Sequence, residues 1–189
     1  MFTVVLDACV ILPATLNDTI LRLAEANCFD VRWSDRILEE VRRNMVADRF
    51  NITPDAADRR LGEMKNAFPF ATVEGYEALI PSMGNDTKDR HVLAAAVRSD
   101  AHTIVTANLK DFPPHALYPW GIEAVHPDEF LLSQLELKPA TVLAVVSSQV
   151  SENKHPPRSA GELFFVLRRC GVPDFADELA RHHDDGHGL

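Results

Sequence analysis

The stretch GNDTKDRHVLAAAVRSDAHTIVTANLKDF, from Gly84 to Phe112, predicts a helix followed by a buried strand, with acidic residues where these elements begin and end. Asn85 or Asp86 can cap the helix, which carries an apolar face from Val92 to Ala96. Asp89 is expected in the first turn, where exposed N–H groups and the positive end of the helix dipole favour a charged carboxylate. We therefore expect Asp89 to stay ionised and available to a metal ion.

Two short apolar strands are expected to end beside this acidic group. Phe2 to Leu6 form a continuous apolar run that stops at Asp7, and Thr103 to Val105 form a second run, which leads towards Asp111. In open parallel sheets, ligands bind beyond the carboxyl ends of the strands, so both segments could open onto one cleft. The pattern predicts an α/β fold with a central parallel sheet.

Carboxylates dominate this predicted cleft. A carboxylate at the end of a buried apolar strand, such as that of Asp7, costs several kcal/mol unless it is paired or coordinated. Asp7, Asp89 and Asp111, without interleaved His or Cys, fit Mg²⁺ or Mn²⁺ and disfavour zinc. Each acid also has a structural interpretation as a helix cap or turn residue, which we prefer for Asp86.

The composition predicts one globular core plus a small appendage. The chain has 189 residues, 46% of them hydrophobic, and a formal net charge of −9. It has no apolar run of the roughly 20 residues that a membrane helix needs, and its N-terminus does not resemble a signal peptide, so we expect a cytoplasmic protein without membrane contact. The acidic charge disfavours phosphate binding unless divalent cations reverse the sign of the pocket.

Three cysteines, Cys9, Cys28 and Cys170, lack C-x-x-C spacing. We interpret them as buried thiols rather than as a disulfide framework or a zinc ribbon. His91 and His102 are expected on a helix and in a turn, and we interpret both as ordinary structural residues.

Between the two halves of the predicted cleft, the pattern indicates further helices and two short strands, the first from Phe29 to Trp33. Ser34 caps a helix that carries Glu40 beside an apolar stripe, and Thr53 starts the next helix. For Glu40, a solvated residue paired with Arg36 or Arg43 is at least as good an interpretation as a functional role. A short strand is expected from Phe70 to Val73.

The first two long helices carry more apolar residues than one face of a sheet obviously needs. These residues are Leu21, Leu23, Ile37, Leu38, Val41 and Met45. A second protein could cover part of this surface, and burial in the chain's own core is the alternative.

The C-terminal part of the chain predicts helices only, and we expect a small helical extension there. The expected divisions are 1–136 for the α/β domain, 137–182 for the extension and 183–189 for a disordered polar tail. His182, His183 and His187 could bind a transition metal, but the disordered terminus is the favoured interpretation.

Four segments, in this order, resemble the PIN-domain nucleases, and among them the VapC-type toxins of bacterial toxin–antitoxin pairs. They are VLDACVIL from Val5, the Ser34-x-x-x-x-x-Glu40 helix, DRHVLAAA from Asp89 and VTANLKDF from Val105. The resemblance covers residues 1 to 132 and implies a three-layer α/β/α PIN fold. The helical extension is similar to that of a longer VapC subgroup.

The resemblance also implies an activity: a Mg²⁺- or Mn²⁺-dependent endoribonuclease that acts as the toxin of a type II toxin–antitoxin system. The implied site residues are Asp7, Asp89 and Asp111 for the metal, Glu40 for the attacking water, and Thr106 and Asn108 as polar residues beside Asp111. We expect Thr106, Asn108 and Asp86 to position the substrate. The implied partners are RNA and a cognate antitoxin, which in this family lies across the first helices and pushes a basic side chain towards the acidic cleft. A homodimer is left open.

Two alternatives stay open. Another phosphate-handling α/β hydrolase would also end its first strand with an aspartate, but a haloacid-dehalogenase-type phosphatase needs a second acid two residues later, where this chain has Cys9. The other alternative is a PIN fold that binds RNA or a protein without cleaving RNA. A metal titration would separate this module from a nuclease.

Overall fold

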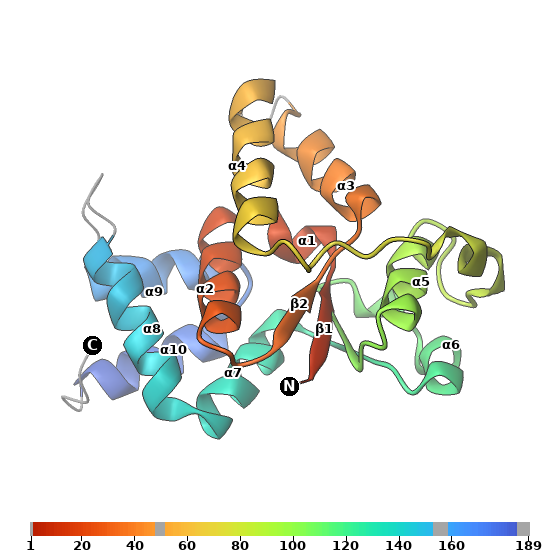
Figure 1. Cartoon of the computed structure of the whole chain (residues 1–189). Coiled ribbons are helices and arrows are strands. Elements are labelled where there is room, and N and C mark those ends of the chain that lie inside the picture. Colours follow the sequence, from red (N-terminus) through yellow and green to blue (C-terminus); the bar gives the residue numbers. More distant parts are fainter. Residues whose placement is uncertain (1, 48–51, 153–158, 185–189) are drawn as a thin grey trace. The chain divides into compact units, whose positions relative to one another are not determined.

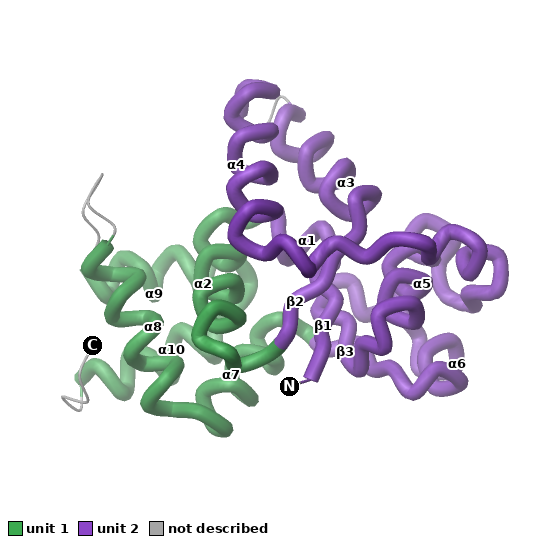
Figure 2. Tube along the Cα trace, viewed as in Figure 1, with its two compact units in different colours: residues 1, 13–29, 126–189 green, residues 2–12, 30–125 purple. Residues whose placement is uncertain are grey.

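The structure, a computed structural model, describes residues 2–47, 52–152 and 159–184. The chain forms two compact units, which Figure 2 draws in different colours. The sheet unit consists of residues 2–12 and 30–125, and the helical unit contains residues 13–29 and the segment from residue 126 onward. All the acidic residues predicted for the site therefore belong to the sheet unit.

The sheet unit contains four parallel strands in the order β2-β1-β3-β4. The strands are β1 (Thr3–Leu6), β2 (Asp30–Arg32), β3 (Thr103–Val105) and β4 (Glu123–Val125). The helices around them are α1 (Ala8–Ile11), α3 (Asp35–Met45), α4 (Pro54–Ala67), α5 (Arg90–Arg98) and α6 (Pro114–Leu117), with the 3₁₀ helices η1 (Glu77–Ser82), η2 (Leu109–Asp111) and η3 (Tyr118–Trp120). The parallel sheet confirms the predicted α/β fold class.

The central strands β1 and β3 are neighbours, with Val5 opposite Ile104. Their apolar side chains are fully buried, and α5 packs against both strands (Figure 1). Both faces of a central parallel strand are covered, which is why these segments are continuous apolar runs in the sequence. Because the strands are parallel, their carboxyl ends meet at one edge, where the N–H of Asp7 donates to the carbonyl of Val105 (3.1 Å).

Two helices begin at the predicted capping residues. At the start of α3, Ser34 Oγ accepts a hydrogen bond from the N–H of Ile37 (3.3 Å), and at the start of α4, Thr53 Oγ1 accepts one from the N–H of Ala56 (3.3 Å). Pro54 is the first residue of α4, a position where its missing N–H costs no intrahelical bond. Local side-chain chemistry therefore fixes where both helices begin.

The strand predicted from Phe70 to Val73 is wrong as an element. It is reduced to an isolated bridge between Trp33 and Thr72. Pro69 has no N–H for a strand ladder, and Phe70 is 86% exposed, so this segment has neither the pairing nor the burial that extends a strand.

The helical unit contains α2 (Ala14–Glu25), α7 (Pro127–Leu137), α8 (Pro139–Glu152), α9 (Ala160–Arg169) and α10 (Pro173–Asp184). α10 packs against α7 and α9, and α2 packs against α8 and α9. Thus α2 and α7 share a compact unit with the C-terminal helices, although almost all of their residues precede the boundary expected after residue 136. That boundary stays a prediction.

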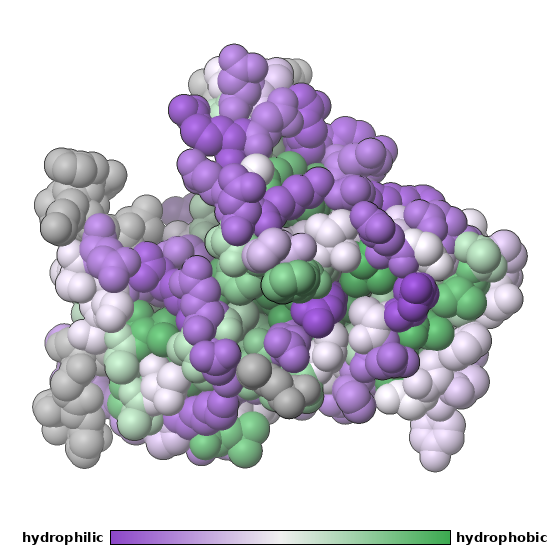
Figure 3. All heavy atoms as spheres, viewed as in Figure 1, coloured by the Kyte–Doolittle hydropathy of each residue, from purple (hydrophilic) through white to green (hydrophobic). Residues whose placement is uncertain are grey.

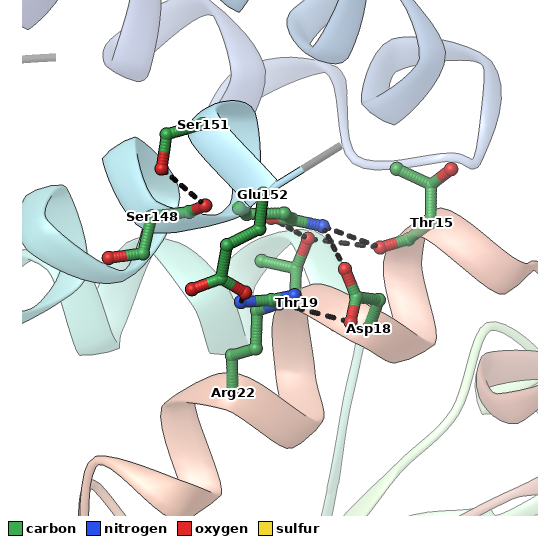
Figure 4. A network of polar contacts seen from close by, with 8 residues as sticks. Thr15, Asp18, Thr19, Arg22, Ser148, Ser151 and Glu152 are labelled. Atoms are coloured by element: carbon green, nitrogen blue, oxygen red, sulfur yellow. Dashed lines mark hydrogen bonds and ion pairs between the residues drawn. The ribbon is translucent and has the colours of Figure 1, made fainter. Parts of the chain in front are cut away.

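A network of polar contacts joins α8 to α2 in the helical unit (Figure 4), and it includes the buried Gln149. Gln149 accepts a hydrogen bond from Thr19 Oγ1 (3.0 Å) and donates one to Asp18 Oδ2 (2.9 Å). Arg22 extends the network, because it bonds Asp18 Oδ1 (3.0 Å) and Glu152 Oε2 (2.7 Å). The buried amide is thereby satisfied, as a polar group away from water must be.

A second polar contact joins α7 to α10. The carboxylate of Asp128 accepts hydrogen bonds from the backbone N–H groups of Asp174 (3.1 Å) and Phe175 (2.8 Å). These N–H groups lie in the first turn of α10, where they have no intrahelical acceptor. An acid from one helix therefore caps another.

The end of the described chain belongs to α10, which includes His182 and His183. His187, the third histidine of the predicted tail, lies outside the described residues. None of the described helices is by itself long and apolar enough to span a membrane, and only α7 and α8, which are bent by 117° at their junction, pass that test as a pair.

Candidate functional site

Asp7 lies between β1 and α1, and its carboxylate is held by three donors. Its Oδ1 accepts from the N–H of Ala8 (2.7 Å), which makes Asp7 the N-cap of α1. Its Oδ2 accepts from Thr106 Oγ1 (2.7 Å) and from Cys9 Sγ (3.2 Å). The side chain is almost completely buried. The expectation that only a partner charge or a metal could offset this burial is therefore corrected, because hydrogen bonds from the chain itself offset it.

The loop after β3 is built around the same carboxylate. Thr106 Oγ1 donates to Asp7 and accepts from the N–H of Asn108 (3.0 Å), and the N–H of Ala107 donates to Cys9 Sγ (3.3 Å). The structure thus brings Thr106 next to Asp7, as the resemblance implied. Asn108 joins this cluster through its backbone, while its residue is exposed.

Cys9 is a hydrogen-bond donor at this site rather than a nucleophile. Burial, and then the charge of Asp7, raise the pKa of its thiol to about 12. The thiol is therefore protonated at neutral pH, and it acts as a donor to Asp7. The prediction of buried thiols is confirmed for Cys28, whereas Cys9 and Cys170 are partly exposed and all three are free.

Asp89 occupies the N-cap position of α5, one residue before the first turn in which it was expected. Burial raises its pKa to about 6, and the charges of Asp7 and Asp111 add to this shift, while Lys88 opposes it. The prediction that the helix end keeps the pKa of Asp89 low is therefore wrong. Asp89 is still mostly ionised at neutral pH, as expected. The mutual repulsion indicates that these three carboxylates share one region.

Glu40, on α3, is directed to α5 by a hydrogen bond. Its Oε1 lies 3.1 Å from Nε2 of His91, whose side chain is fully buried, and 3.9 Å from the guanidinium of Arg43. Burial alone would raise the pKa of Glu40, but the hydrogen bond and charge of His91, followed by the charges of Arg43 and Arg36, lower it. Glu40 is therefore ionised at neutral pH and contributes a fourth negative charge, which Asp89 also senses.

The interpretation of His91 as an ordinary residue missed this contact. The only signal in the sequence is the position of His91 two residues after Asp89, close to the start of the same helix. Its partner is 51 residues away in the chain, so spacing alone cannot find the pair.

Asp86 and Asp111 meet through the backbone, since the N–H of Asp86 donates to the carbonyl of Asp111 (3.2 Å). Asp86 Oδ1 accepts from the N–H of Lys88 (3.0 Å), so Asp86 closes the turn before α5 and is not the cap of the helix itself. Asp111 ends η2, which places it beside this turn. This loop therefore joins the segments that carry Asp89 and Asp111.

The donor set fits a hard divalent cation in chemical type. Aspartate oxygens are the ligands that Mg²⁺ and Mn²⁺ prefer. A bound cation would also neutralise the negative charges of Asp7 and Asp111, which raise the pKa of Asp89. In the part of the chain that the structure describes, however, no three His, Cys, Asp or Glu side chains are already arranged to hold an ion. The carboxylates are pooled rather than preformed as a complete ligand shell.

We expect Asp89→Asn to raise the melting temperature of the metal-free protein at pH 7 to 8. Asp89 has a folded-state pKa of about 6, above its ordinary 3.8, so the folded state binds the proton more tightly than the unfolded state. Its stabilising contribution is present below pH 3.8 and is lost as the pH rises through 6. The gain of the neutral variant should therefore appear above pH 6 and vanish near pH 4.

Differential scanning calorimetry in EDTA at several pH values measures this gain. Glu74→Gln, at an exposed position of the sheet unit, is the matched control for loss of one negative charge. An Asp89→Asn protein that melts at or below the wild-type temperature at pH 8 would contradict the repulsion.

The predicted apolar partner surface is wrong for five of its six residues. Leu23, Ile37, Leu38, Val41 and Met45 are buried within the chain, and Leu21 is partly exposed. Hydrophilic residues make up most of the surface over α3 and α4 in the view of Figure 3. The ion pairs Arg42–Asp58 and Lys65–Asp35 join the two helices. A helix packed on a core uses the same apolar stripe, and that alternative holds here.

Comparison with known families finds matches to two segments of the chain. Residues 3–110 match the family model described as PIN domain, and residues 127–181 match the model of the VapC50 C-terminal domain. A Mycobacterium tuberculosis protein described as "Putative ribonuclease VapC50" is 46% identical over 121 residues, which are 64% of this chain and 71% of that protein. No solved structure matches the chain. The chain therefore belongs to the PIN-domain family, as a VapC-type member with a C-terminal extension.

Proposed function

We propose that this protein is a Mg²⁺- or Mn²⁺-dependent endoribonuclease and the toxin of a type II toxin–antitoxin system. The observation that carries the proposal is the pooling of carboxylates in a PIN domain, seen in the pKa of Asp89, which burial and the charges of Asp7 and Asp111 raise to about 6. The M. tuberculosis relative, which is described as a ribonuclease, supports the same substrate class.

In the proposed site, Asp7, Asp89 and Asp111 hold the cation, which supplies charge neutralisation and activation of water when it is bound. Thr106 and Cys9 fix the orientation of the Asp7 carboxylate through their hydrogen bonds. Glu40, ionised beside His91, is an acceptor that can orient a water molecule or take its proton.

The direct test is cleavage of defined RNAs by purified protein with Mn²⁺, with Mg²⁺ and with EDTA. Cleavage with either metal and its loss in EDTA are expected. Cleavage that persists in EDTA would overturn the metal requirement, and no cleavage of any RNA with either metal would overturn the nuclease proposal.

Metal binding is expected to raise the melting temperature even when no RNA is present. A ligand that binds only the folded state stabilises it by mass action, and here it also removes the repulsion among the carboxylates. Calorimetry with increasing Mn²⁺ at pH 7.5 measures the shift. An equal shift in a D7N/D89N/D111N triple variant would show that the ion acts elsewhere.

The second candidate function is a PIN-fold module that binds RNA or protein without cleavage. It is favoured by one observation, namely that no three ligand side chains among the described residues are already arranged around an ion. The two functions differ in the metal titration, since a binding module would retain RNA in a mobility-shift assay and show neither a Mn²⁺-dependent melting shift nor cleavage.

We propose a cognate antitoxin as the protein partner on the basis of VapC-type membership. The apolar residues first considered for this contact are mostly buried, so the proposal rests on the acidic cleft. There, an inserted Arg would form charge-assisted bonds with Asp7, Asp89 or Asp111. Co-expression with the small reading frame next to the gene should give a stable complex that no longer cleaves RNA. A neighbour that neither binds nor inhibits would remove the toxin part of the proposal.

A further inference from the structure

The hydrogen bond between Glu40 and His91 crosses from α3 to α5. Its donor–acceptor distance is 3.1 Å, the His91 side chain is 0% exposed and the Glu40 side chain is 22% exposed. A glutamate on a helix surface has three rotatable bonds and would otherwise extend to solvent or to the exposed Arg43. Here, one of its carboxylate oxygens forms a hydrogen bond with a fully buried imidazole ring.

The chemistry of the pair decides which atom carries the proton. The Glu40 carboxylate is ionised at neutral pH, because its pKa is lowered, and an ionised carboxylate can only accept hydrogen bonds. Nε2 of His91 must therefore be the donor. Nδ1 is buried without a hydrogen-bond partner among the described residues. The hydrogen bond therefore runs from Nε2–H of His91 to Oε1 of Glu40.

His91 lies close in the chain to Asp89, one of the proposed metal ligands, and it also bonds Glu40. Asp89 lies two residues earlier, at the N-cap of the same helix, and the charge of Glu40 contributes to its raised pKa, after burial and the charges of Asp7 and Asp111. Among the described residues of α5, His91 is the one that forms a hydrogen bond with the Glu40 side chain. This hydrogen bond thus connects the Glu40 side chain to the helix that begins next to Asp89.

We propose that His91 is the positioning residue for Glu40, and that its Nε2–H holds the Glu40 carboxylate against the first turn of α5 for the reaction. The hydrogen bond follows from the 3.1 Å distance between Oε1 of Glu40 and Nε2 of His91. Its effect on RNA cleavage rests on the proposed function. His91 touches neither substrate nor metal in this role and acts only through Glu40.

His91→Met and His91→Gln test the proposal as a matched pair. Methionine fills similar space without a donor, while glutamine can place an N–H near the position of Nε2. His91→Met should lower kcat for RNA cleavage by about tenfold or more and change KM by less than about twofold, because a positioning bond acts on the reacting complex. His91→Gln should recover most of the lost kcat.

A double-variant cycle with Glu40→Gln separates positioning from packing. If His91 acts only through Glu40, His91→Met should add almost no further loss to the Glu40→Gln protein. Thermal unfolding is measured for every variant. If His91→Met does not fold, His91→Gln decides: a kcat within about threefold of wild type supports the proposal, and a tenfold or larger loss in a stably folded protein overturns it.

A readout without metal or RNA keeps the inference apart from the proposed function. In ¹⁵N-resolved NMR of the metal-free protein, a proton should be observed on Nε2 of His91, with slowed exchange that Glu40→Ala accelerates. A ring protonated at Nδ1 alone would overturn the inference even if the protein cleaves RNA. If the protein cleaves no RNA, the proposed function fails, while the NMR result still decides the hydrogen bond.

A folded His91→Met protein with wild-type kcat would overturn the positioning role.

Discussion

Asp7→Asn should lower the rate of metal-dependent RNA cleavage by more than about 100-fold while the protein stays folded. Replacing a residue behind a metal ligand typically costs about 10- to 100-fold in metal affinity or activity, so loss of the proposed ligand charge should cost more. The amide cannot supply the negative charge that the cation requires. A parallel loss of Mn²⁺ affinity is expected in calorimetry.

The Asp7→Asn protein should still fold, because asparagine can form hydrogen bonds at the same positions as Asp7. Its side-chain oxygen can still accept from the N–H of Ala8, and asparagine is as good an N-cap as aspartate. The hydroxyl of Thr106 can rotate to accept from the new amide. Melting temperature and cleavage are measured side by side, with Asp55→Asn at an exposed position of α4 as the control. A folded Asp7→Asn protein that cleaves at the wild-type rate would sink the metal assignment.

Asp128→Ala should lower the free energy of unfolding by about 2 to 4 kcal/mol, because it removes a helix cap and leaves two first-turn N–H groups of α10 without an acceptor. The residue is 8% exposed, so water cannot fully replace the carboxylate. The loss should fall on the helical unit, since α7 and α10 both belong to it.

Urea denaturation followed by circular dichroism measures this loss. Glu129→Ala, at the exposed next position of the same helix turn, is the control and should change the stability by only a few tenths of a kcal/mol. Asp128→Asn should fall between them, since it retains one acceptor oxygen. Equal stability of the Asp128→Ala and Glu129→Ala proteins would contradict the capping role.

The sequence predicts the fold well where one local signal decides. The strand expected from Thr103 to Val105 is β3, with the same limits, because an apolar run between turns has one stable use in a parallel sheet. Ser34 and Thr53 cap their helices as expected. The helix α1 was not expected, because four residues carry no helical period and the helix depends on the cap that Asp7 provides.

The candidate site could be predicted as a set of positions but not as a set of contacts. Strand ends identify Asp7 and the segment after Val105, since parallel strands share an edge. The bond from Thr106 to Asp7 joins residues 99 positions apart, and that from His91 to Glu40 depends on how two helices are rotated about their axes. Periodicity does not specify either. The expectation for Asp89 failed because the helix end was considered without burial and neighbouring charges.

The three hydrogen bonds at Asp7 bear on ion selectivity. A carboxylate offers about four lone-pair positions, and Ala8, Thr106 and Cys9 already occupy three of them. Asp7 can then coordinate an ion through one oxygen only, unless one of these bonds breaks. Mg²⁺ and Mn²⁺ accept such monodentate ligands, whereas Ca²⁺ commonly takes bidentate carboxylates and more ligands in total. These hydrogen bonds on Asp7 thus disfavour Ca²⁺ at a cluster of aspartates.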